Sequence, residues 1–370
     1  MLERYGHGGD LITAEAEYGR PAGGFLDFSS NMNPFGPPEV VGEIVQSGWR
    51  EISRYPDPAV RELRRKLADK YDIEPESILV GNGAAELIDL AIRVLGPGAT
   101  GIARPSFTEY EEAVVKIGGV TVDIPLHAES GFSPQEQAIR EAVRQTDLVA
   151  LGHPNNPTGQ LLDPELMRAL AREGVPLLLD EAFMDFVPDE RAFSLLRDAS
   201  RTPHVHVLRS MTKFYAIPGI RLGFIVSHPD SVRRLRERQV PWSVNYFAQR
   251  IGAAVLDDIE YEERTQRWLA EESVWLRAEL GRLGLTVFPG RVNYVLFALP
   301  QRNPNRPLRV QEVQRRMGER GILIRDASRF RGLDDRYVRV AIKLRGENER
   351  LVQALEEVIR SIEAEEEGAR

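Results

Sequence analysis

The feature that most constrains the fold is a repeated alternation of short apolar runs with longer amphipathic stretches. The apolar runs have the length of strands and follow one another between residues 77 and 226. They are Ser77–Val80, Gly101–Ala103, Val120–Ile124, Leu148–Leu151, Pro176–Leu179, Val205–Leu208 and Leu222–Val226. Near-continuous apolar runs are typical of strands that are buried on both faces. The pattern predicts an α/β fold with a mostly parallel central sheet and helices on both faces.

The remaining segments predict how the chain divides into domains. An irregular opening rich in Gly and Pro, residues 1–38, is expected to be an arm that packs near the active site. Residues 39–270 form the expected large domain, and residues 271–370 a smaller α+β domain at the C-terminus. The smaller domain is predicted from the helices and strands that the sequence indicates there. The helices are expected at 261–283 and 310–320, with a last one that ends at about 363, and the strands at Asn293–Ala298, Ile322–Arg325 and Tyr337–Ile342.

Composition excludes several classes of function. The formal net charge is −8 and the basic residues are scattered, which argues against a nucleic-acid or anionic-membrane surface. No apolar run reaches the length of a membrane span and no export pattern opens the chain, so we expect a cytoplasmic protein that acts on small molecules. The 370 residues include no cysteine, which excludes disulfides, thiolate metal sites and a cysteine nucleophile. We expect no metal.

Lysine is rare, and this directs attention to one segment. Of the 48 basic residues only five are lysines: Lys66, Lys70, Lys116, Lys213 and Lys343. Arginine stays protonated and cannot form an imine, so amine-based covalent chemistry has few candidates. Lys213 stands among apolar and small residues, where desolvation would lower its pKa. Ser210, Thr212 and Arg221 surround it with two hydroxyls and a fixed cation, which suits a phosphate, although a random lysine is usually a surface residue.

A second phosphate-binding pattern occurs where one predicted strand turns into a helix. Gly81-Asn82-Gly83-Ala84 joins the two, and free amides at a helix N-terminus attract anions. Such turns often serve only to connect elements, so the pattern is weak alone.

Two other strands end in polar residues. Asp180 follows the apolar run Pro176–Leu179, at the strand end where ligands bind in parallel sheets. A buried carboxylate needs a cationic partner, which a protonated pyridine nitrogen would be, whereas a helix cap is the ordinary alternative. Asn156 lies in a turn fixed by Pro154, Pro157 and Gly159 and could donate to a phenolate oxygen. We interpret His153 as a structural residue of this turn.

These four segments, in this order, resemble the fold-type I pyridoxal-phosphate enzymes, and in particular the histidinol-phosphate aminotransferase branch. The resemblance implies that residues 39–270 bind pyridoxal 5'-phosphate, with Lys213 as the catalytic residue that holds the cofactor as a Schiff base. Further cofactor contacts implied in the same way are Asp180 on the ring nitrogen, Asn156 on the ring hydroxyl, Phe107 stacked on the ring, and Gly83, Ala84, Ser210, Thr212 and Arg221 around the phosphate.

The resemblance also implies a homodimer whose active sites lie at the subunit interface. Tyr55, in Arg54-Tyr55-Pro56, matches a residue that reaches the phosphate from the neighbouring subunit. One position departs from the pattern. These aminotransferases usually have Asp-Glu-Ala-Tyr, whereas this chain has Phe183, and we expect the lost hydroxyl to raise the pKa of the Schiff base.

Several stretches more closely resemble the L-threonine-O-3-phosphate decarboxylase family of cobalamin biosynthesis. They include Tyr5-Gly6-His7-Gly8-Gly9-Asp10, Asn31-Met32-Asn33-Pro34, Asp180-Glu181-Ala182-Phe183-Met184 and Val240-Pro241-Trp242. The resemblance implies a phosphorylated amino acid as substrate, Arg339 on its carboxylate and Arg325 on its phosphate, with His7, Asn33 and Asn156 as further contacts. A histidinol-phosphate aminotransferase and a catalytically idle pyridoxal-phosphate protein remain as alternatives.

Overall fold

The large sheet is the central element of the computed structural model, which describes residues 8–301 and 308–368. Its seven strands have the order β2-β8-β7-β6-β5-β3-β4, and all but β8 run in one direction. The strands are β2 (Ile78–Gly81), β3 (Ala99–Arg104), β4 (Val120–Pro125), β5 (Leu148–Gly152), β6 (Leu177–Asp180), β7 (Val205–Ser210) and β8 (Gly223–Val226). All seven strands predicted from the apolar runs are confirmed, and so is the mostly parallel sheet.

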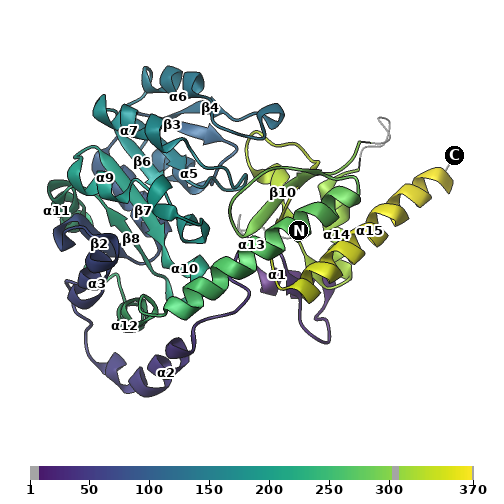
Figure 1. The fold of residues 1–370 in the computed structure, drawn as a ribbon, viewed down its shortest axis with the longest axis horizontal. Helices are drawn as coiled ribbons and strands as arrows, with labels where there is room; N and C mark the ends of the chain where they lie inside the picture. Colours follow the sequence, from purple (N-terminus) through teal and green to yellow (C-terminus); the bar gives the residue numbers. More distant parts are fainter. Residues whose placement is uncertain (1–7, 302–307, 369–370) are drawn as a thin grey trace.

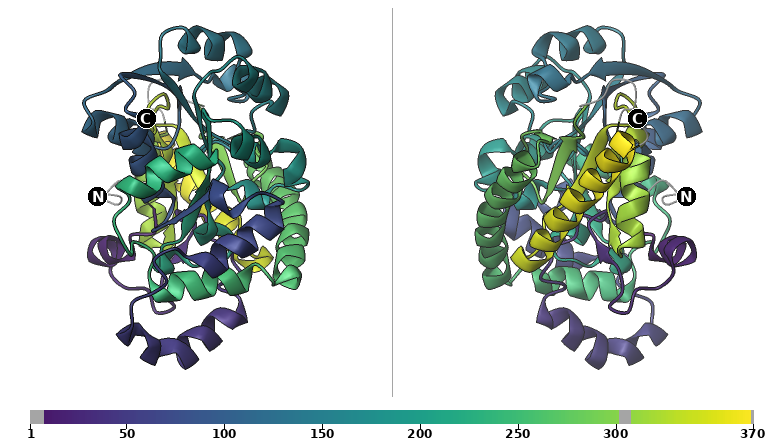
Figure 2. Two further views of the ribbon diagram at one scale, coloured as in Figure 1. Left: turned by 90° about the vertical axis from the view of Figure 1, so that its left-hand side faces the viewer. Right: turned by 90° about the vertical axis from the view of Figure 1, so that its right-hand side faces the viewer.

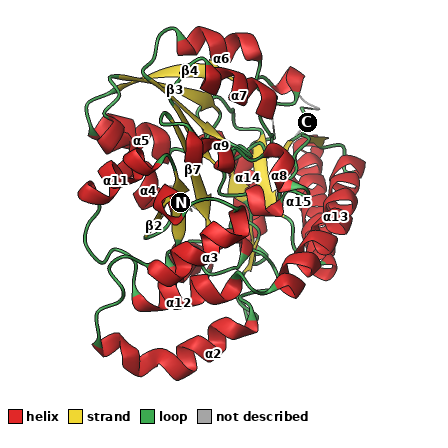
Figure 3. Cartoon of the chain, turned by 60° about the vertical axis from the view of Figure 1, so that its left-hand side comes forward, coloured by secondary structure: helices red, strands yellow, loops and turns green. Residues whose placement is uncertain are grey.

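Helices cover both faces of this sheet, as Figure 3 shows. Alternate side chains of one strand enter different cores: Leu177 and Leu179 pack on one face and Leu178 on the other. The helices of the chain are α1 (Leu11–Tyr18), α2 (Glu39–Gly48), α3 (Arg61–Tyr71), α4 (Ala84–Leu95), α5 (Glu109–Lys116), α6 (Glu136–Val143), α7 (Pro164–Arg172), α8 (Glu190–Phe193), α9 (Leu196–Arg201), α10 (Met211–Phe214), α11 (Pro229–Arg238), α12 (Tyr246–Val255), α13 (Ile259–Arg282), α14 (Val310–Glu319) and α15 (Arg345–Gly368).

A separate antiparallel sheet forms the core of the C-terminal part. Its order is β12-β13-β10-β9, with β9 (Thr286–Val287), β10 (Tyr294–Ala298), β12 (Arg325–Asp326) and β13 (Tyr337–Ala341). Helix α13 runs between the two parts of the molecule (Figure 1), and the expected boundary at residue 270 falls inside it. Figure 2 shows α14 and α15 side by side on the outer surface.

One strand prediction in this region is wrong. The expected strand Ile322–Arg325 is divided into β11 (Ile322–Leu323) and β12, and the two belong to different sheets. The reason is that β11 pairs in parallel with an N-terminal strand, β1 (Leu26–Asp27), that the sequence pattern did not indicate. The backbone therefore leaves one partner for another at Ile324.

The N-terminal segment packs on the C-terminal part. Contrary to expectation it is not irregular throughout, because α1 begins after Asp10, whose side chain accepts a hydrogen bond from the Thr13 N–H. The ring of Tyr18 lies so close to α14 that a Cβ on Gly318 would meet it at 2.3 Å. Among the helices of the described residues, none is both long enough and apolar enough to cross a membrane.

Candidate active site

A cavity of about 380 Å³ lies where the carboxyl ends of the strands of the large sheet face the antiparallel sheet of the C-terminal part. It brings together ten of the predicted site residues: Ala84, Phe107, Asn156, Asp180, Ser210, Thr212, Lys213, Arg221, Arg325 and Arg339. They come from both sheets and from the turns that follow β2, β3, β5, β6 and β7. A wider groove of about 1050 Å³ between α3 and α13 contains none of the predicted site residues, so we place the chemistry in the smaller cavity.

One end of the cavity has the geometry of an anion cradle. Helix α4 begins there, after Gly83 at a φ of 87°. A Cβ at Gly83 would lie 2.5 Å from Nη2 of Arg221, so only glycine allows the guanidinium to approach the helix N-terminus. Arg221 itself has a φ of 61°, a strained conformation for a residue with a side chain. The hydroxyls of Ser210 and Thr212 are 2.8 Å apart at the same site. These groups offer amides, hydroxyls and a cation to a phosphate.

Asp180 is the buried carboxylate of the cavity, with 7% of its surface exposed. The Tyr110 hydroxyl donates to Oδ2 over 2.7 Å, and the Ala182 N–H donates to Oδ1 over 2.9 Å. Burial raises the pKa of Asp180, whereas these two hydrogen bonds and the charge of Lys213 lower it. The carboxylate is therefore held in place without a direct ion pair among the described residues, and a cationic group in the cavity would satisfy it.

Lys213 is the nucleophile candidate, on the short helix α10 directly after β7. Burial lowers its pKa to about 8, and the nearby charges of Arg221 and Arg339 act in the same direction, while Asp180 opposes them. A lowered pKa increases the fraction of neutral amine, which is the form that attacks a carbonyl carbon.

Two arginines face each other on the small sheet. Arg325 of β12 and Arg339 of β13 are directly opposite in the antiparallel register, and their exposed fractions are 5% and 6%. Arg339 donates from Nη1 to Oδ1 of Asn156 over 2.5 Å and from Nη2 to the Ser29 carbonyl over 2.9 Å. Like charges at opposed positions repel, so this arrangement favours a ligand that carries more than one negative charge.

The loop after β5 holds Asn156 against the cavity. His153 is fully buried in this loop. Its Nδ1 accepts from the Leu162 N–H over 3.0 Å and its Nε2 lies 3.1 Å from the Phe193 carbonyl. Both ring nitrogens are used by the backbone, which confirms the structural interpretation of His153.

The sequence of residues 24–355 matches the family model for aminotransferase class I and II. The chain belongs to the aminotransferase class I and II family. Its relatives in this family include the threonine-phosphate decarboxylase of Salmonella typhimurium, which is 38% identical over 96% of this chain and 97% of the relative. The histidinol-phosphate aminotransferase of Oleidesulfovibrio alaskensis is 34% identical over 90% of this chain and 88% of the relative.

Solved structures of this aminotransferase family also share the fold. The L-threonine-O-3-phosphate decarboxylase from Porphyromonas gingivalis superimposes with a TM-score of 0.78 at 27% sequence identity. The match covers 90% of this chain and 99% of that chain. The expected fold class is therefore confirmed.

Three predicted site residues of the described chain are not among those that line the cavity. The side chain of Asn33 does not reach it, because its amide donates to the Phe214 carbonyl over 3.0 Å and to Thr265 Oγ1 over 2.7 Å. Gly83 is absent from the lining, although a Cβ at this position would lie 2.5 Å from Nη2 of Arg221. Tyr55 is 82% exposed and packs on Trp242 with ring centroids 4.9 Å apart. His7 lies outside the described residues.

The sequence did not indicate several residues that line the cavity, and two polar ones among them, Tyr110 and Asn31, bear on its chemistry. Tyr110 stands in the first turn of α5, three positions after Phe107, so its closeness in sequence to the predicted stacking residue was the available signal. Asn31 lines the cavity in place of Asn33, and its buried Oδ1 has no hydrogen-bond partner in the described part of the chain. No periodic pattern distinguishes the two asparagines, because the segment that carries them is irregular.

Proposed function

We propose that this protein removes the α-carboxylate of L-threonine O-3-phosphate as carbon dioxide, with pyridoxal 5'-phosphate as cofactor. The product would be (R)-1-amino-2-propanol O-2-phosphate, a precursor in cobalamin biosynthesis. The observation that carries the proposal is the pair of buried, opposed guanidinium groups of Arg325 and Arg339 beside Lys213. A substrate with a carboxylate and a phosphate offers one anionic group to each guanidinium. The 38% identity to a threonine-phosphate decarboxylase over nearly the whole chain supports the same assignment.

The residues of the cavity fit the cofactor. The cradle made by the α4 N-terminus, Arg221, Ser210 and Thr212 would hold its phosphate. Asp180, a buried carboxylate without a direct cationic partner in the described chain, would hold the protonated ring nitrogen. Asn156 and Phe107 would contact the ring. Pyridoxal phosphate supplies an aldehyde that condenses with a primary amine and a conjugated ring that accepts the electron pair of a broken bond at the α-carbon.

The other steps fall to the chain's own side chains. Lys213 reacts as the neutral amine, which its pKa of about 8 makes accessible near neutral pH. Arg339 binds the substrate carboxylate with its planar guanidinium, and its bond to Asn156 fixes the direction of that guanidinium. Arg325 binds the substrate phosphate, and Asn31 lines the same cavity. A carboxylate held in one direction decides which bond at the α-carbon breaks. After carbon dioxide leaves, the Lys213 side chain in its ammonium form is the group that can donate a proton to that carbon, which leaves it as the neutral amine again.

We also propose a cytoplasmic homodimer with active sites at the subunit interface. An exposed apolar group supports this: Trp49, Ile52, Tyr55, Val240 and Trp242 are each at least half exposed and come from two neighbouring segments of the large domain. Large exposed aromatic residues in one region mark interaction surfaces. Tyr55 would extend from this surface into the partner's cavity.

The experiment that tests the proposed function follows two products at once. Purified protein loaded with pyridoxal phosphate is mixed with L-threonine O-3-phosphate, and carbon dioxide release is recorded together with the cofactor absorbance. We expect carbon dioxide and an unchanged cofactor after turnover. No carbon dioxide, but conversion of the cofactor to pyridoxamine phosphate by histidinol phosphate, would instead establish the aminotransferase activity that the 34% identical relative suggests. Lys213→Ala should abolish both signals, whereas Lys116→Ala on the outer surface of α5 should retain them.

A further inference from the structure

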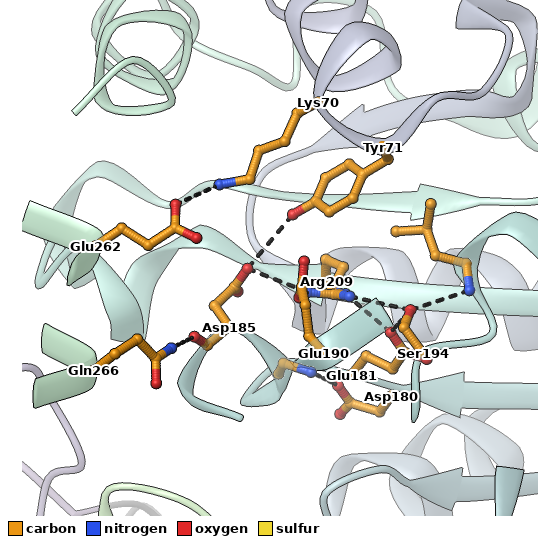
Figure 4. Close-up of polar contacts among 12 residues, drawn as sticks. Lys70, Tyr71, Asp180, Glu181, Asp185, Glu190, Ser194, Arg209, Glu262 and Gln266 are labelled. Atoms are coloured by element: carbon orange, nitrogen blue, oxygen red, sulfur yellow. Dashed lines mark hydrogen bonds and ion pairs between the residues drawn. The ribbon is translucent and has the colours of Figure 1, made fainter. Parts of the chain in front are cut away.

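A buried ion cluster lies directly behind the cavity, and the proposed function leaves it unused. Its centre is Arg209 of β7, whose side chain is 1% exposed. The guanidinium lies 3.0 Å from Glu181, 3.1 Å from Asp185 and 2.7 Å from Glu190. Nη2 also donates to Ser194 Oγ over 3.1 Å. Figure 4 shows that these side chains, all from residues 181–194, converge on Arg209 of β7.

Glu181 is the most constrained carboxylate of this cluster, with none of its side chain exposed. Its Oε2 accepts from Nε of Arg209 over 3.0 Å and from Ser194 Oγ over 2.7 Å. Its Oε1 accepts from the Leu195 N–H over 2.9 Å. Three donors therefore hold this one carboxylate.

The cluster joins two segments whose neighbouring residues line the cavity. Glu181 follows Asp180, and Arg209 precedes Ser210. Strands β6 and β7 are parallel with Asp180 opposite Leu208, and the Glu181 N–H donates to the Leu208 carbonyl over 2.8 Å. Because successive side chains of a strand point to opposite faces, Arg209 lies behind Ser210. The ion pair thus links the ends of both strands on the side away from the cavity.

Charge balance argues that the cluster is more than a source of stability. Three carboxylates surround one guanidinium, and removing ions from water offsets much of their attraction, so buried pairs add little net stability. Burial raises the pKa of Asp185 to about 6, so a proton removes part of the excess charge only below that pH. What the cluster does provide is a fixed geometry, because a planar guanidinium with three acceptors has one orientation.

We propose that Arg209 is a positioning residue that, through Glu181, fixes Asp180 relative to the turn Ser210–Lys213. The inference rests on the proposed function, in which Asp180 would hold the ring nitrogen of pyridoxal phosphate and the turn would hold its phosphate and its aldehyde. Groups that bind opposite ends of one rigid ligand must keep a fixed separation, and residues behind them set that separation. Arg209 contacts neither the ligand nor the reacting atoms.

The test compares Arg209→Lys with the wild type. Lysine keeps the charge but loses the planar fork, so Glu181 loses its fixed partner. We expect the dissociation constant of pyridoxal phosphate, measured by absorbance titration, to rise about 10- to 100-fold, as for residues that orient metal ligands. The pH midpoint of the absorbance of the bound cofactor should also shift. In the protein without cofactor, amide hydrogen exchange should become faster in residues 180–182 and 208–214.

Controls separate positioning from folding. Arg316→Lys alters another multiply paired arginine, bound to Glu312 and Glu365 on the outer surface, and should change none of the three readouts. Glu181→Gln keeps the shape and provides a second test if Arg209→Lys does not fold. Folded variants with wild-type affinity, midpoint and exchange would overturn the proposal, as would loss of folding in both. The exchange measurement needs no cofactor, so a wild type that binds no pyridoxal phosphate refutes the proposed function without removing this test.

Discussion

The hydroxyl of Tyr110 donates a hydrogen bond of 2.7 Å to Oδ2 of Asp180, and both side chains are buried. This contact joins the first turn of α5 to the end of β6, two elements that are separated by 70 residues in the chain. It is one of two hydrogen bonds that hold the carboxylate, and both lower its pKa against the effect of burial. Tyr110 therefore favours the ionised form of Asp180, which is the form that a cationic ring nitrogen requires.

Tyr110→Phe should weaken cofactor binding. The variant removes the donor and leaves the ring in place, so the pKa of Asp180 rises and its ionised form becomes less favourable. Because a hydrogen bond to a charged group is lost, we expect the dissociation constant of pyridoxal phosphate to rise on the order of tenfold. Absorbance titration with pyridoxal phosphate measures it. Tyr246→Phe on α12 serves as the control, and equal affinities of the two variants would contradict the role of Tyr110.

Lys213→Met should stabilise the protein without cofactor, most strongly below pH 8. The pKa of Lys213 is lowered to about 8 from 10.5, so burying its charge destabilises the folded state at lower pH. Between pH 8 and 10.5 the folded form is neutral while the unfolded form still binds a proton, and the wild type gains stability. The advantage of the variant is on the order of 1–3 kcal/mol at pH 7 and should vanish above pH 10.5. Urea denaturation across this range measures it, and a difference independent of pH would contradict the lowered pKa.

The sequence predicted the large sheet well because its signal is local. Each buried strand carries its own apolar run, so Leu177–Asp180 could be identified without knowing its neighbours. The N-terminal strand Leu26–Asp27 has only two residues, and it exists because it pairs with Ile322–Leu323 almost 300 residues later. No local pattern contains that pairing, and for the same reason the division of the expected strand at Ile324 was missed.

In the candidate site, too, the residues of local motifs were predicted and those placed by tertiary packing were not. Lys213, Asp180 and Arg221 stand in short motifs whose spacing already indicates their chemistry. Asn31 and Tyr110 enter the cavity only through tertiary packing, and the two asparagines of Asn31-Met32-Asn33 differ only in where their backbones direct them. The cluster around Arg209 was not predicted either, because its carboxylates all stand in the ten residues after β6 and meet Arg209 of β7 only in the folded chain.

Arg339→Lys should raise the KM for L-threonine O-3-phosphate by roughly 10- to 100-fold, the size expected for lost hydrogen bonds to a charged group. Lysine retains the charge but cannot bind a carboxylate in two places. The variant also loses the hydrogen bond from Arg339 to Asn156, so the orientation of the cationic group at position 339 is no longer fixed. Steady-state kinetics with carbon dioxide detection measure the effect. Arg336→Lys, one residue before the same strand and paired with Asp334 at the surface, is the matched control. An unchanged KM in Arg339→Lys would exclude this residue from substrate binding.

Asp185→Asn should change how stability depends on pH in the acid range. Burial raises the pKa of Asp185 to about 6 from 3.8, so the folded state holds its proton more tightly than the unfolded state does. The protonated Asp185 therefore contributes to the free energy of unfolding of the wild type, fully below pH 3.8, and this contribution is lost as the pH rises through 6. The variant lacks the titration, so its stability relative to the wild type should increase between pH 4 and pH 6 and then stay constant. Parallel denaturation midpoints across this interval would show that Asp185 does not titrate there.

Phe183→Tyr should lower the pH midpoint at which the absorbance of the bound cofactor changes. Phe183 is 6% exposed and lies edge-on to Tyr294 with ring centroids 5.1 Å apart, beside Asp180 in the cavity wall. A tyrosine at this position brings a hydroxyl that can donate to the ring oxygen of the cofactor, and a donor stabilises the oxygen's negative charge. The proton on the neighbouring nitrogen is then lost at lower pH.

A spectroscopic pH titration of the loaded protein measures this midpoint directly. Phe186→Tyr provides a matched control, because the same hydroxyl is added at a fully buried ring three residues later that does not line the cavity. A downward shift in Phe183→Tyr alone would identify Phe183 as the position that sets the proton affinity of this site. Equal midpoints in Phe183→Tyr and the wild type would mean that the added hydroxyl does not reach the ring oxygen, and another donor, such as Asn156, would then control it.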